Sequence, residues 1–303
     1  MTTPTSSCLL GDDLPLASLS ESQALCFVNQ DERDRAWDLG IFYLAIPESL
    51  DLEGARSFGL TLLDQDSPYR KIRQYGDFEG FIALENNQQT KLALRRCHWD
   101  RHYPTEIAAF GRMLDAIGMV IMRDVLSHAG IPEPCWGEAS GGYALGEGTA
   151  FLNFVHYDTS TSNEGLRPHT DYGFVTILDA TKPGLQVELG GVFQDVPVRP
   201  GYLAVHFGEA LRYITAASSK GVSAVRHRVL SQEASNSIRN GIVYFANPDL
   251  DGNLVQFDSH GECSSQSSVS DFFGLLERQR IVIMTQVCLL PLLVGNGHQP
   301  PAG

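Results

Sequence analysis

The second half of the chain alternates short hydrophobic, β-prone runs with breaks rich in Gly, Pro, Asn and Asp. The runs are residues 151–157, 174–178, 185–189, 192–198, 202–207, 223–230 and 238–246. Many short strands separated by turn residues favour an all-β sandwich or barrel. The alternation of strands and helices that is typical of a doubly wound α/β fold is absent from this half.

The first half contains the clearest helical pattern, between Pro104 and Gly130. Its apolar residues follow one another at steps of one, three and four, which places them on one face of a helix. They are Ile107, Phe110, Met113, Leu114, Ile117, Val120, Ile121 and Val125. Thr105 is the expected N-cap and Gly130 the expected glycine after the C-cap. Such a helix is expected to pack against the outside of a sheet.

Two shorter helices are also predicted. One ends near Gly40 and is followed by a buried strand at residues 41–45, and the other runs from Val269 to about Arg280. The longest apolar stretch, residues 281–294, is too short to cross a membrane and is interpreted as core or a docked tail.

Composition and charge narrow the class of protein. With 303 residues, 43% hydrophobic and 19% charged, the chain has the composition of a globular protein rather than a disordered one. Its net charge of −14 argues against binding to nucleic acid or to an anionic membrane surface. The six cysteines are dispersed without a CxxC motif, and no signal peptide is visible, so a cytoplasmic location with free thiols is expected.

A candidate metal site lies in the sequence Arg-Pro-His-Thr-Asp-Tyr-Gly at residues 167–173. In extended chain, His169 and Asp171 point to the same side, about 6.6 Å apart along the strand. His227, in a later predicted strand, can supply a third ligand. Two His and one carboxylate on one face of a metal leave other coordination positions open, as in non-haem Fe(II) oxygenases. An HxD pair alone is weak evidence, and it could also be a turn Asp beside a surface His.

Several further motifs follow in order and give this pair its context. They are Gly184-Leu185-Gln186-Val187, Pro200-Gly201, Gly208-Glu209, His227-Arg228-Val229 and Arg239-Asn240-Gly241. Together with His169-Thr170-Asp171, they resemble the iron(II)- and 2-oxoglutarate-dependent oxygenase superfamily, and within it the isopenicillin N synthase-like branch. The detailed resemblance covers residues 150–250, whereas the N-terminal half matches only loosely.

This resemblance implies a mainly β fold with helices, namely a double-stranded β-helix (jelly roll) braced by the helices at 104–130 and 269–280. It implies one oxygenase domain over residues 1–303, with a mixed N-terminal part (1–149), a jelly-roll core (150–250) and a C-terminal helix and tail (251–303). His169, Asp171 and His227 would hold Fe(II). Arg239 would bind the distal carboxylate of 2-oxoglutarate, since guanidinium pairs with carboxylate through two hydrogen bonds. O2 completes the set of cofactors and co-substrates.

The chain departs from the family pattern at three positions. Gly241 stands where relatives usually carry a Ser that contacts 2-oxoglutarate. His156 stands near a position that often offers a Tyr hydroxyl, so it could bind the co-substrate or be a core His. Period-two alternation puts Asn153, Val155 and Tyr157 on one face of this strand and Phe154 and His156 on the other. His206 stands where many relatives have Asn and is interpreted as structural.

The predicted reaction is oxidation of a small molecule, expected to be a natural product, by a monomeric enzyme through hydroxylation, desaturation, cyclisation or ring expansion. Two alternatives stay open: an iron oxidase that does not use 2-oxoglutarate, and a jelly-roll binding protein without catalysis. A basic cluster before the β half could hold a carboxylate-bearing substrate or form an ion-paired, solvated face. Its candidate residues are Arg70, Arg73, Arg95 and Arg96.

Overall fold

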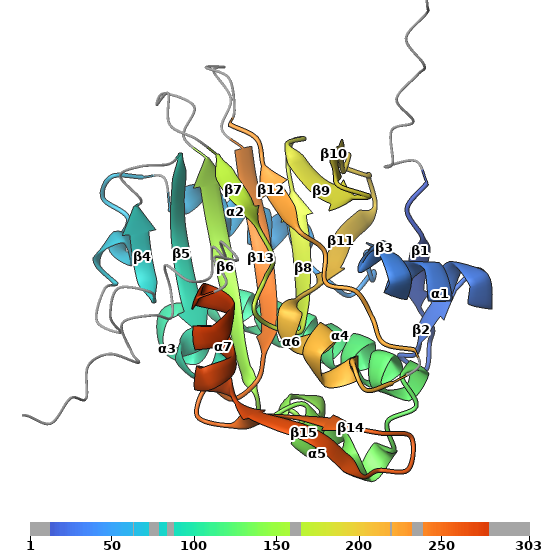
Figure 1. The fold of residues 1–303 in the computed structure, drawn as a ribbon. Helices are drawn as coiled ribbons and strands as arrows, with labels where there is room; N and C mark the ends of the chain where they lie inside the picture. Colours follow the sequence, from blue (N-terminus) through green and yellow to red (C-terminus); the bar gives the residue numbers. More distant parts are fainter. Residues whose placement is uncertain are drawn as a thin grey trace, which may run out of the picture.

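The structure is a computed structural model that describes residues 13–62, 64–72, 79–83, 88–157, 165–218, 220–231 and 239–278. Two β-sheets face one another, and helices cover the outside of the larger one (Figure 1). The seven α-helices in the described ranges are α1 (Gln30–Leu39), α2 (Leu52–Thr61), α3 (Trp99–His102), α4 (Thr105–His128), α5 (Trp136–Ala139), α6 (Glu209–Thr215) and α7 (Val269–Arg278). None of these helices is long and apolar enough to span a membrane.

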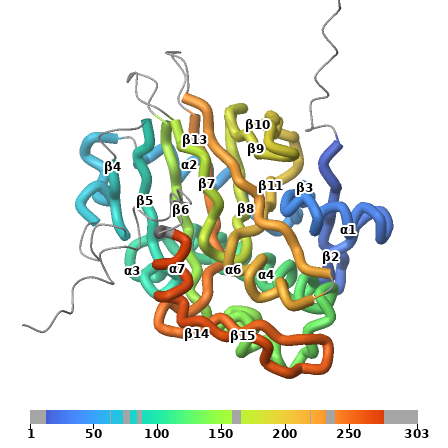
Figure 2. Tube along the Cα trace, viewed as in Figure 1, coloured from blue at the N-terminus to red at the C-terminus, as the bar shows by residue number. Residues whose placement is uncertain are grey.

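The larger sheet has nine strands and is antiparallel except for one parallel pair at the N-terminal side. In spatial order its strands are β2 (Leu25–Phe27), β1 (Leu16–Leu19), β3 (Ile41–Ala45), β11 (Tyr202–Phe207), β8 (Val175–Ala180), β13 (Arg239–Asn247), β6 (Thr149–Tyr157), β5 (Gln89–Arg95) and β4 (Gly80–Ala83). Strands distant in sequence therefore lie side by side, as β13 does between β6 and β8 (Figure 2).

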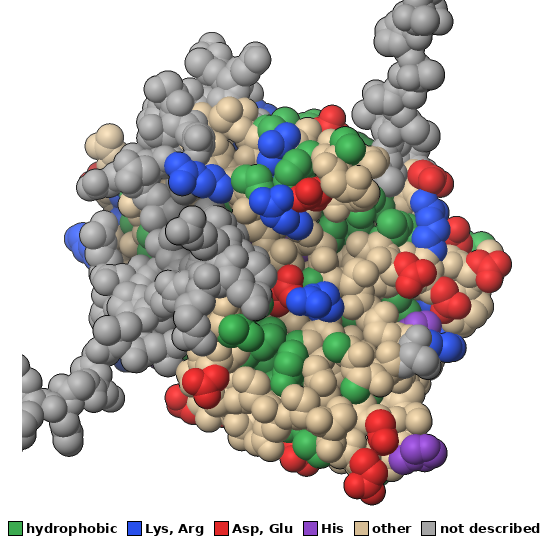
Figure 3. Space-filling model, viewed as in Figure 1, with side chains coloured by type: hydrophobic (Ala, Val, Ile, Leu, Met, Phe, Trp, Pro, Cys, Tyr) green, Lys and Arg blue, Asp and Glu red, His purple; other side chains and the backbone are tan. Residues whose placement is uncertain are grey.

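The smaller sheet has four strands, in the order β10 (Val192–Asp195), β9 (Leu185–Leu189), β12 (His227–Val229) and β7 (Leu166–His169). A hairpin of β14 (Asn253–Phe257) and β15 (Cys263–Ser268) packs at one end of the molecule (Figure 1). The two facing sheets form the predicted double-stranded β-helix. Figure 3 shows several Lys and Arg side chains in the upper part of the face in view.

Two apolar clusters fill the space on either side of the large sheet. One joins its outer face to α2 and α4, with Phe154, Tyr244 and Ile121 among its fully buried members. The other lies between the sheets and joins Val155 of the large sheet to Val187 of the small one. Strand β6 is thus buried on both faces, and alternate residues reach different clusters.

The predicted helices are present, with two differences. α4 begins at Thr105, and Pro104 occupies the N-cap position without a side-chain hydrogen bond, so the prediction of Thr105 as N-cap is wrong. At the other end, Gly130 has the left-handed φ of 72° that is expected after the C-cap. Within the described residues α7 reaches Arg278, and it does not cover the outer face of the large sheet as α4 does (Figure 1). It lies against β15, and its Phe273 ring is 4.6 Å from the ring of Tyr172, beside the candidate metal ligands.

Candidate metal centre

Three ionisable side chains meet between the two sheets. His169 ends β7, Asp171 follows two residues later, and His227 begins β12 opposite His169 in the strand register. One ligand atom from each lies within 4.8 Å of the others, and all three residues are buried. The structure therefore brings together the three residues that the sequence singled out.

The local sequence explains how β7 can present His169. This strand contains Pro168, which cannot donate a backbone hydrogen bond and is tolerated mainly on edge strands. β7 is the edge strand of the small sheet, with β12 as its partner there. A strand at the sheet edge can turn sharply after His169, which directs Asp171 back towards the same point.

Backbone contacts orient both imidazoles. The Nδ1–H of His169 donates to the carbonyl of Arg167 at 2.7 Å, and that of His227 donates to the carbonyl of Val225 at 3.2 Å. Each Nε2 is then the unprotonated nitrogen, which is the form that binds a metal. These Nε2 atoms lie 3.6 Å (His169) and 3.8 Å (His227) from Oδ1 of Asp171.

The charges of the cluster also suit a metal. Burial lowers the pKa of His227, and the neighbouring imidazoles lower it further, so this ring is neutral at pH 7. Burial by itself would raise the pKa of Asp171, but the surrounding imidazoles, His227 first, hold it below its usual value. The cluster therefore offers the neutral imidazole of His227 and the carboxylate of Asp171, with the Nε2 of His169 beside them.

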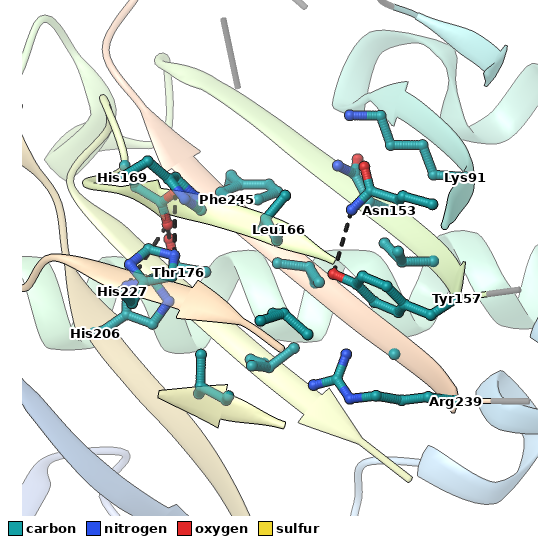
Figure 4. Close-up of a pocket in the computed structure, with 18 residues that line it drawn as sticks. Lys91, Asn153, Tyr157, Leu166, His169, Thr176, His206, His227, Arg239 and Phe245 are labelled. Carbon is teal, nitrogen blue, oxygen red and sulfur yellow. Dashed lines mark hydrogen bonds and ion pairs between the residues drawn. The ribbon is translucent and has the colours of Figure 1, made fainter. Parts of the chain in front are cut away.

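A pocket extends from this cluster between the two sheets (Figure 4). Its wall combines apolar side chains with polar ones from both sheets. The lining residues are Gln89, Lys91, Asn153, Val155, Tyr157, Leu166, His169, Asp171, Thr176, Leu178, Leu185, His206, His227, Val229, Arg239, Gly241, Val243 and Phe245. The His and Asp cluster occupies one side of the pocket, and Arg239 and Tyr157 lie across from it.

Arg239 is a buried cation at the start of β13, with 2% of its surface exposed. Its Nε donates to the carbonyl of Lys182 at 3.1 Å. Within the described part of the chain, its Nη2 has no hydrogen-bond partner. A buried guanidinium with a free donor is costly unless an anion binds it, so this pocket is suited to a carboxylate.

The side chains fit the two groups that the resemblance implies. Two ligands bound to one ion at about 2.1 Å lie about 3 to 3.4 Å apart, close to the Oδ1–Nε2 distances of 3.6 and 3.8 Å. Two imidazoles and a carboxylate suit Fe(II) and leave positions open for other ligands. The unpaired Nη2 of Arg239, in the same pocket, suits the far carboxylate of 2-oxoglutarate.

His156 does not line this pocket within the described ranges, so its ring is not placed to contact a co-substrate bound there. Its ring lies on the opposite face of β6, where Nδ1–H donates to Oδ1 of Asn240 at 2.6 Å. It also contacts the backbone of Gly59 in α2. His156 is a core histidine, which was the other reading of the sequence.

The basic cluster has structural partners rather than a place at the pocket. Arg95 pairs with Glu79 at 2.6 Å, and Arg96 pairs with the buried Asp115 at 2.6 Å. The guanidinium carbon of Arg70 lies 4.8 Å from the ring centroid of Phe81. These three residues are absent from the pocket wall within the described ranges, and their role in binding substrate stays a prediction. Arg73 lies outside the described residues.

Sequence reasoning missed several polar residues of the pocket wall, among them Thr176 of β8. Asn153 and Tyr157 come from β6, and Gln89 and Lys91 come from β5. Alternation along β6 placed Asn153 and Tyr157 on one face, but both faces of this strand are buried, so alternation could not say which one the pocket occupies. In β5, the same alternation in Gln-Thr-Lys-Leu-Ala-Leu-Arg was the available signal.

Comparisons with known sequences agree with this geometry. Residues 148–248 match the family model described as the 2OG-Fe(II) oxygenase superfamily. A relative from Oryza sativa subsp. japonica, 2-oxoglutarate-dependent dioxygenase 21, chloroplastic, is 29% identical over 194 residues, which cover 59% of this chain and 56% of the relative. The chain thus spans about half the length of this curated relative.

Solved structures share the fold at low sequence identity. The rice dioxygenase for auxin oxidation matches with a TM-score of 0.67 at 18% identity and covers 91% of this chain and 98% of its own. JOX2 in complex with 2OG, Fe and JA matches with a TM-score of 0.66 at 20% identity, covering 90% and 86%. The matched segment spans all three clustered residues and Arg239, and it assigns residues 148–248 to the 2OG-Fe(II) oxygenase superfamily.

Proposed function

We propose that this protein is an Fe(II)- and 2-oxoglutarate-dependent dioxygenase that oxidises a small organic molecule. The observation that carries the proposal is the shared pocket, in which a buried His-Asp-His cluster faces a buried Arg239 with a free donor. The similar proteins point the same way, since one is named for auxin oxidation and another holds JA together with 2OG and Fe.

In this proposal His169 and His227 hold the metal through Nε2, and Asp171 holds it through a carboxylate oxygen. Arg239 pairs with the distal carboxylate of 2-oxoglutarate and so fixes its direction in the pocket. Iron, 2-oxoglutarate and O2 together supply the oxidising power to break an aliphatic C–H bond, with succinate and CO2 as co-products. The apolar side chains Val155, Leu178 and Val243 line the same pocket as Arg239 and the cluster.

Release of succinate tests the proposal directly. The purified chain is incubated with Fe(II), 2-oxoglutarate and a panel of small-molecule metabolites, and succinate is measured for each. We expect one compound or class to stimulate succinate formation, and His169→Ala, Asp171→Ala and His227→Ala each to abolish it. His128→Leu, at a histidine outside the pocket, should keep full activity.

Two other outcomes would favour the alternatives. Oxidation of a compound at the same rate without 2-oxoglutarate would favour an iron oxidase, and the free Nη2 of Arg239 would then need another anion. Tight binding of a small acid without any turnover would favour a binding protein. The natural-product substrate, the single domain, the monomeric state and the cytoplasmic location stay predictions. The four cysteines in the described ranges are free.

A further inference from the structure

The two oxygens of the Asp171 carboxylate have different surroundings. Oδ1 faces the Nε2 atoms of His169 and His227, at 3.6 and 3.8 Å. Oδ2 faces away from them and accepts a hydrogen bond from Oγ1 of Thr176. On the same side, Nδ1 of His206 lies 3.6 Å from Oδ2. The carboxylate therefore has one oxygen towards the imidazoles of the cluster and one towards the protein.

His206 is a third imidazole beside the cluster. It comes from β11, is 2% exposed, and its ring centroid lies 4.3 Å from that of His227. No partner for its Nδ1 occurs among the residues that the structure describes. It does not belong to the group whose ligand atoms all lie within 4.8 Å of one another. Its position thus suits contact with Asp171 better than a place among the ligands.

We propose that His206 is a positioning residue of the metal centre, and that its Nδ1–H donates to Oδ2 of Asp171. This inference rests on the proposed function, because it assumes that a metal binds at the cluster. The distance of 3.6 Å exceeds a hydrogen bond by about half an ångström, a gap that a small side-chain rotation closes. Such contacts are often long before a site is loaded and tighten afterwards.

The physical consequence concerns how Asp171 binds the ion. With Oδ2 held by both Thr176 and His206, only Oδ1 is available to the metal. Without the contact from His206, Thr176 alone holds Oδ2, and the carboxylate can rotate so that Oδ1 leaves the position that suits the metal. Partners that hold a ligating group in this way typically change metal affinity 10- to 100-fold when they are removed.

Titration of the full chain with Co(II), followed by calorimetry and by the visible absorption of the bound ion, tests this role without any turnover. His206→Leu removes the donor and should weaken Co(II) binding by about 10- to 100-fold. His206→Asn places an amide N–H near the former Nδ1 and should restore affinity to within about threefold, with the wild-type spectrum. His206→Gln places its amide one bond further out and should restore less.

His128→Leu is the matched control. His128 also has its Nδ1 3.6 Å from an aspartate oxygen, that of Asp34, but it lies in α4 outside the pocket. This variant should bind Co(II) like the wild type. The near-ultraviolet circular dichroism of each variant reports whether the fold is intact.

The remaining outcomes separate this inference from the proposed function. If folded His206→Leu binds Co(II) as tightly as the wild type, the role given to His206 is wrong and the proposed function stands. If His206→Asn binds as weakly as His206→Leu and both have an altered spectrum, His206 is a fourth ligand instead. If the folded wild type does not bind Co(II), the metal site itself fails, and both proposals fail with it.

Discussion

The guanidinium of Arg239 lies over the ring of Tyr157, with Cζ 4.8 Å from the ring centroid. The two residues are direct partners in the register of β13 and β6, so the sheet itself holds the cation against the aromatic face. Tyr157 in turn accepts a hydrogen bond at 3.3 Å from Nε2 of Gln89 on the next strand. Stacking and the Nε bond to Lys182 hold the guanidinium in place, while its Nη2 has no hydrogen-bond partner among the described residues.

Replacing Arg239 should therefore impair 2-oxoglutarate use specifically. Removing one partner of a buried charge pair costs about 3–5 kcal/mol. Arg239→Ala should raise the apparent KM for 2-oxoglutarate about 100- to 4,000-fold, since about 1.4 kcal/mol is tenfold. Co(II) affinity should not change. Arg239→Lys should restore little, because a lysine cannot form the planar pair of hydrogen bonds.

Arg228→Ala is the matched control for this series. Its guanidinium also lies over an aromatic ring, 4.2 Å from the centroid of Phe193, but in the four-stranded sheet and outside the pocket wall. It should leave the KM for 2-oxoglutarate unchanged. An unchanged KM in Arg239→Ala would show that another group binds the distal carboxylate.

Two glycines near the site should respond differently to an added methyl group. A Cβ on Gly208 would lie 2.4 Å from the carbonyl oxygen of Gly173 and 2.7 Å from that of Asp171, and neither backbone group can move freely. Gly208→Ala should cost about 1–3 kcal/mol of unfolding free energy and weaken metal binding, because it displaces the turn that carries Asp171. Thermal unfolding and Co(II) titration measure both effects.

Gly241→Ala provides the comparison on the pocket wall. A Cβ there meets the carbonyl oxygen of Asp179 at 3.2 Å, which a shift of a few tenths of an ångström relieves. Gly241→Ser, which restores the hydroxyl common in the family, should change 2-oxoglutarate affinity by only about 1 kcal/mol. Equal loss of stability in the Gly208 and Gly241 variants would contradict this account.

Arg96 should prove structural rather than substrate-binding. It donates to Oδ2 of Asp115, while Tyr244 donates to Oδ1 of the same buried carboxylate. Arg96→Met leaves Asp115 without its cation and should lower the unfolding free energy by about 3 kcal/mol. Arg112→Met breaks the exposed pair with Asp100 and should cost at most about 1 kcal/mol.

Urea denaturation measures these costs, and steady-state kinetics completes the test. The folded fraction of Arg96→Met should have the wild-type KM for substrate. A stable Arg96→Met with a raised substrate KM would instead restore the role that the basic cluster suggested.

Local patterns predicted the centre of the molecule well. The runs that became β6, β8 and β11 are hydrophobic because both faces of these strands are buried. In the run that became β9, the buried residues Leu185 and Val187 alternate with more exposed ones. The HxD pair was recognisable because ligands two residues apart can reach one ion, although Asp171 lies just beyond the end of β7 and not within the strand. His227 could be predicted as the third metal ligand because the family resemblance includes the His227-Arg228-Val229 motif, although His227 is far from His169 in sequence.

Other features have no local signal. Strand β15, Cys-Ser-Ser-Gln-Ser-Ser, is largely exposed and has no hydrophobic alternation, so only its pairing with β14 makes it a strand. The partners of Arg95 and Arg96 lie 16 and 19 residues away, and burial of the acids rather than any motif decides those ion pairs. For His156, alternation gave the correct set of neighbours but not the side on which the pocket lies.

The stability of the protein should fall below pH 6.5, with a contribution from His156. Burial lowers the pKa of this imidazole, and the hydrogen bond to Asn240 only partly opposes that effect. In the unfolded chain the same imidazole has a pKa of about 6.5. Between the lowered pKa and about 6.5 the unfolded state therefore binds more protons than the folded state. The free energy of unfolding must then decrease as the pH falls through this range.

Urea denaturation of the metal-free protein between pH 5 and pH 7.5 measures the slope. His206 and His227 also have lowered pKa values and add to it, so the comparison must isolate His156. His156→Gln keeps a donor for Asn240 but cannot titrate, and its slope should be shallower by up to one proton, about 1.4 kcal/mol per pH unit. Identical slopes would mean that His156 is protonated to the same extent in both states, which its burial between β6 and α2 argues against.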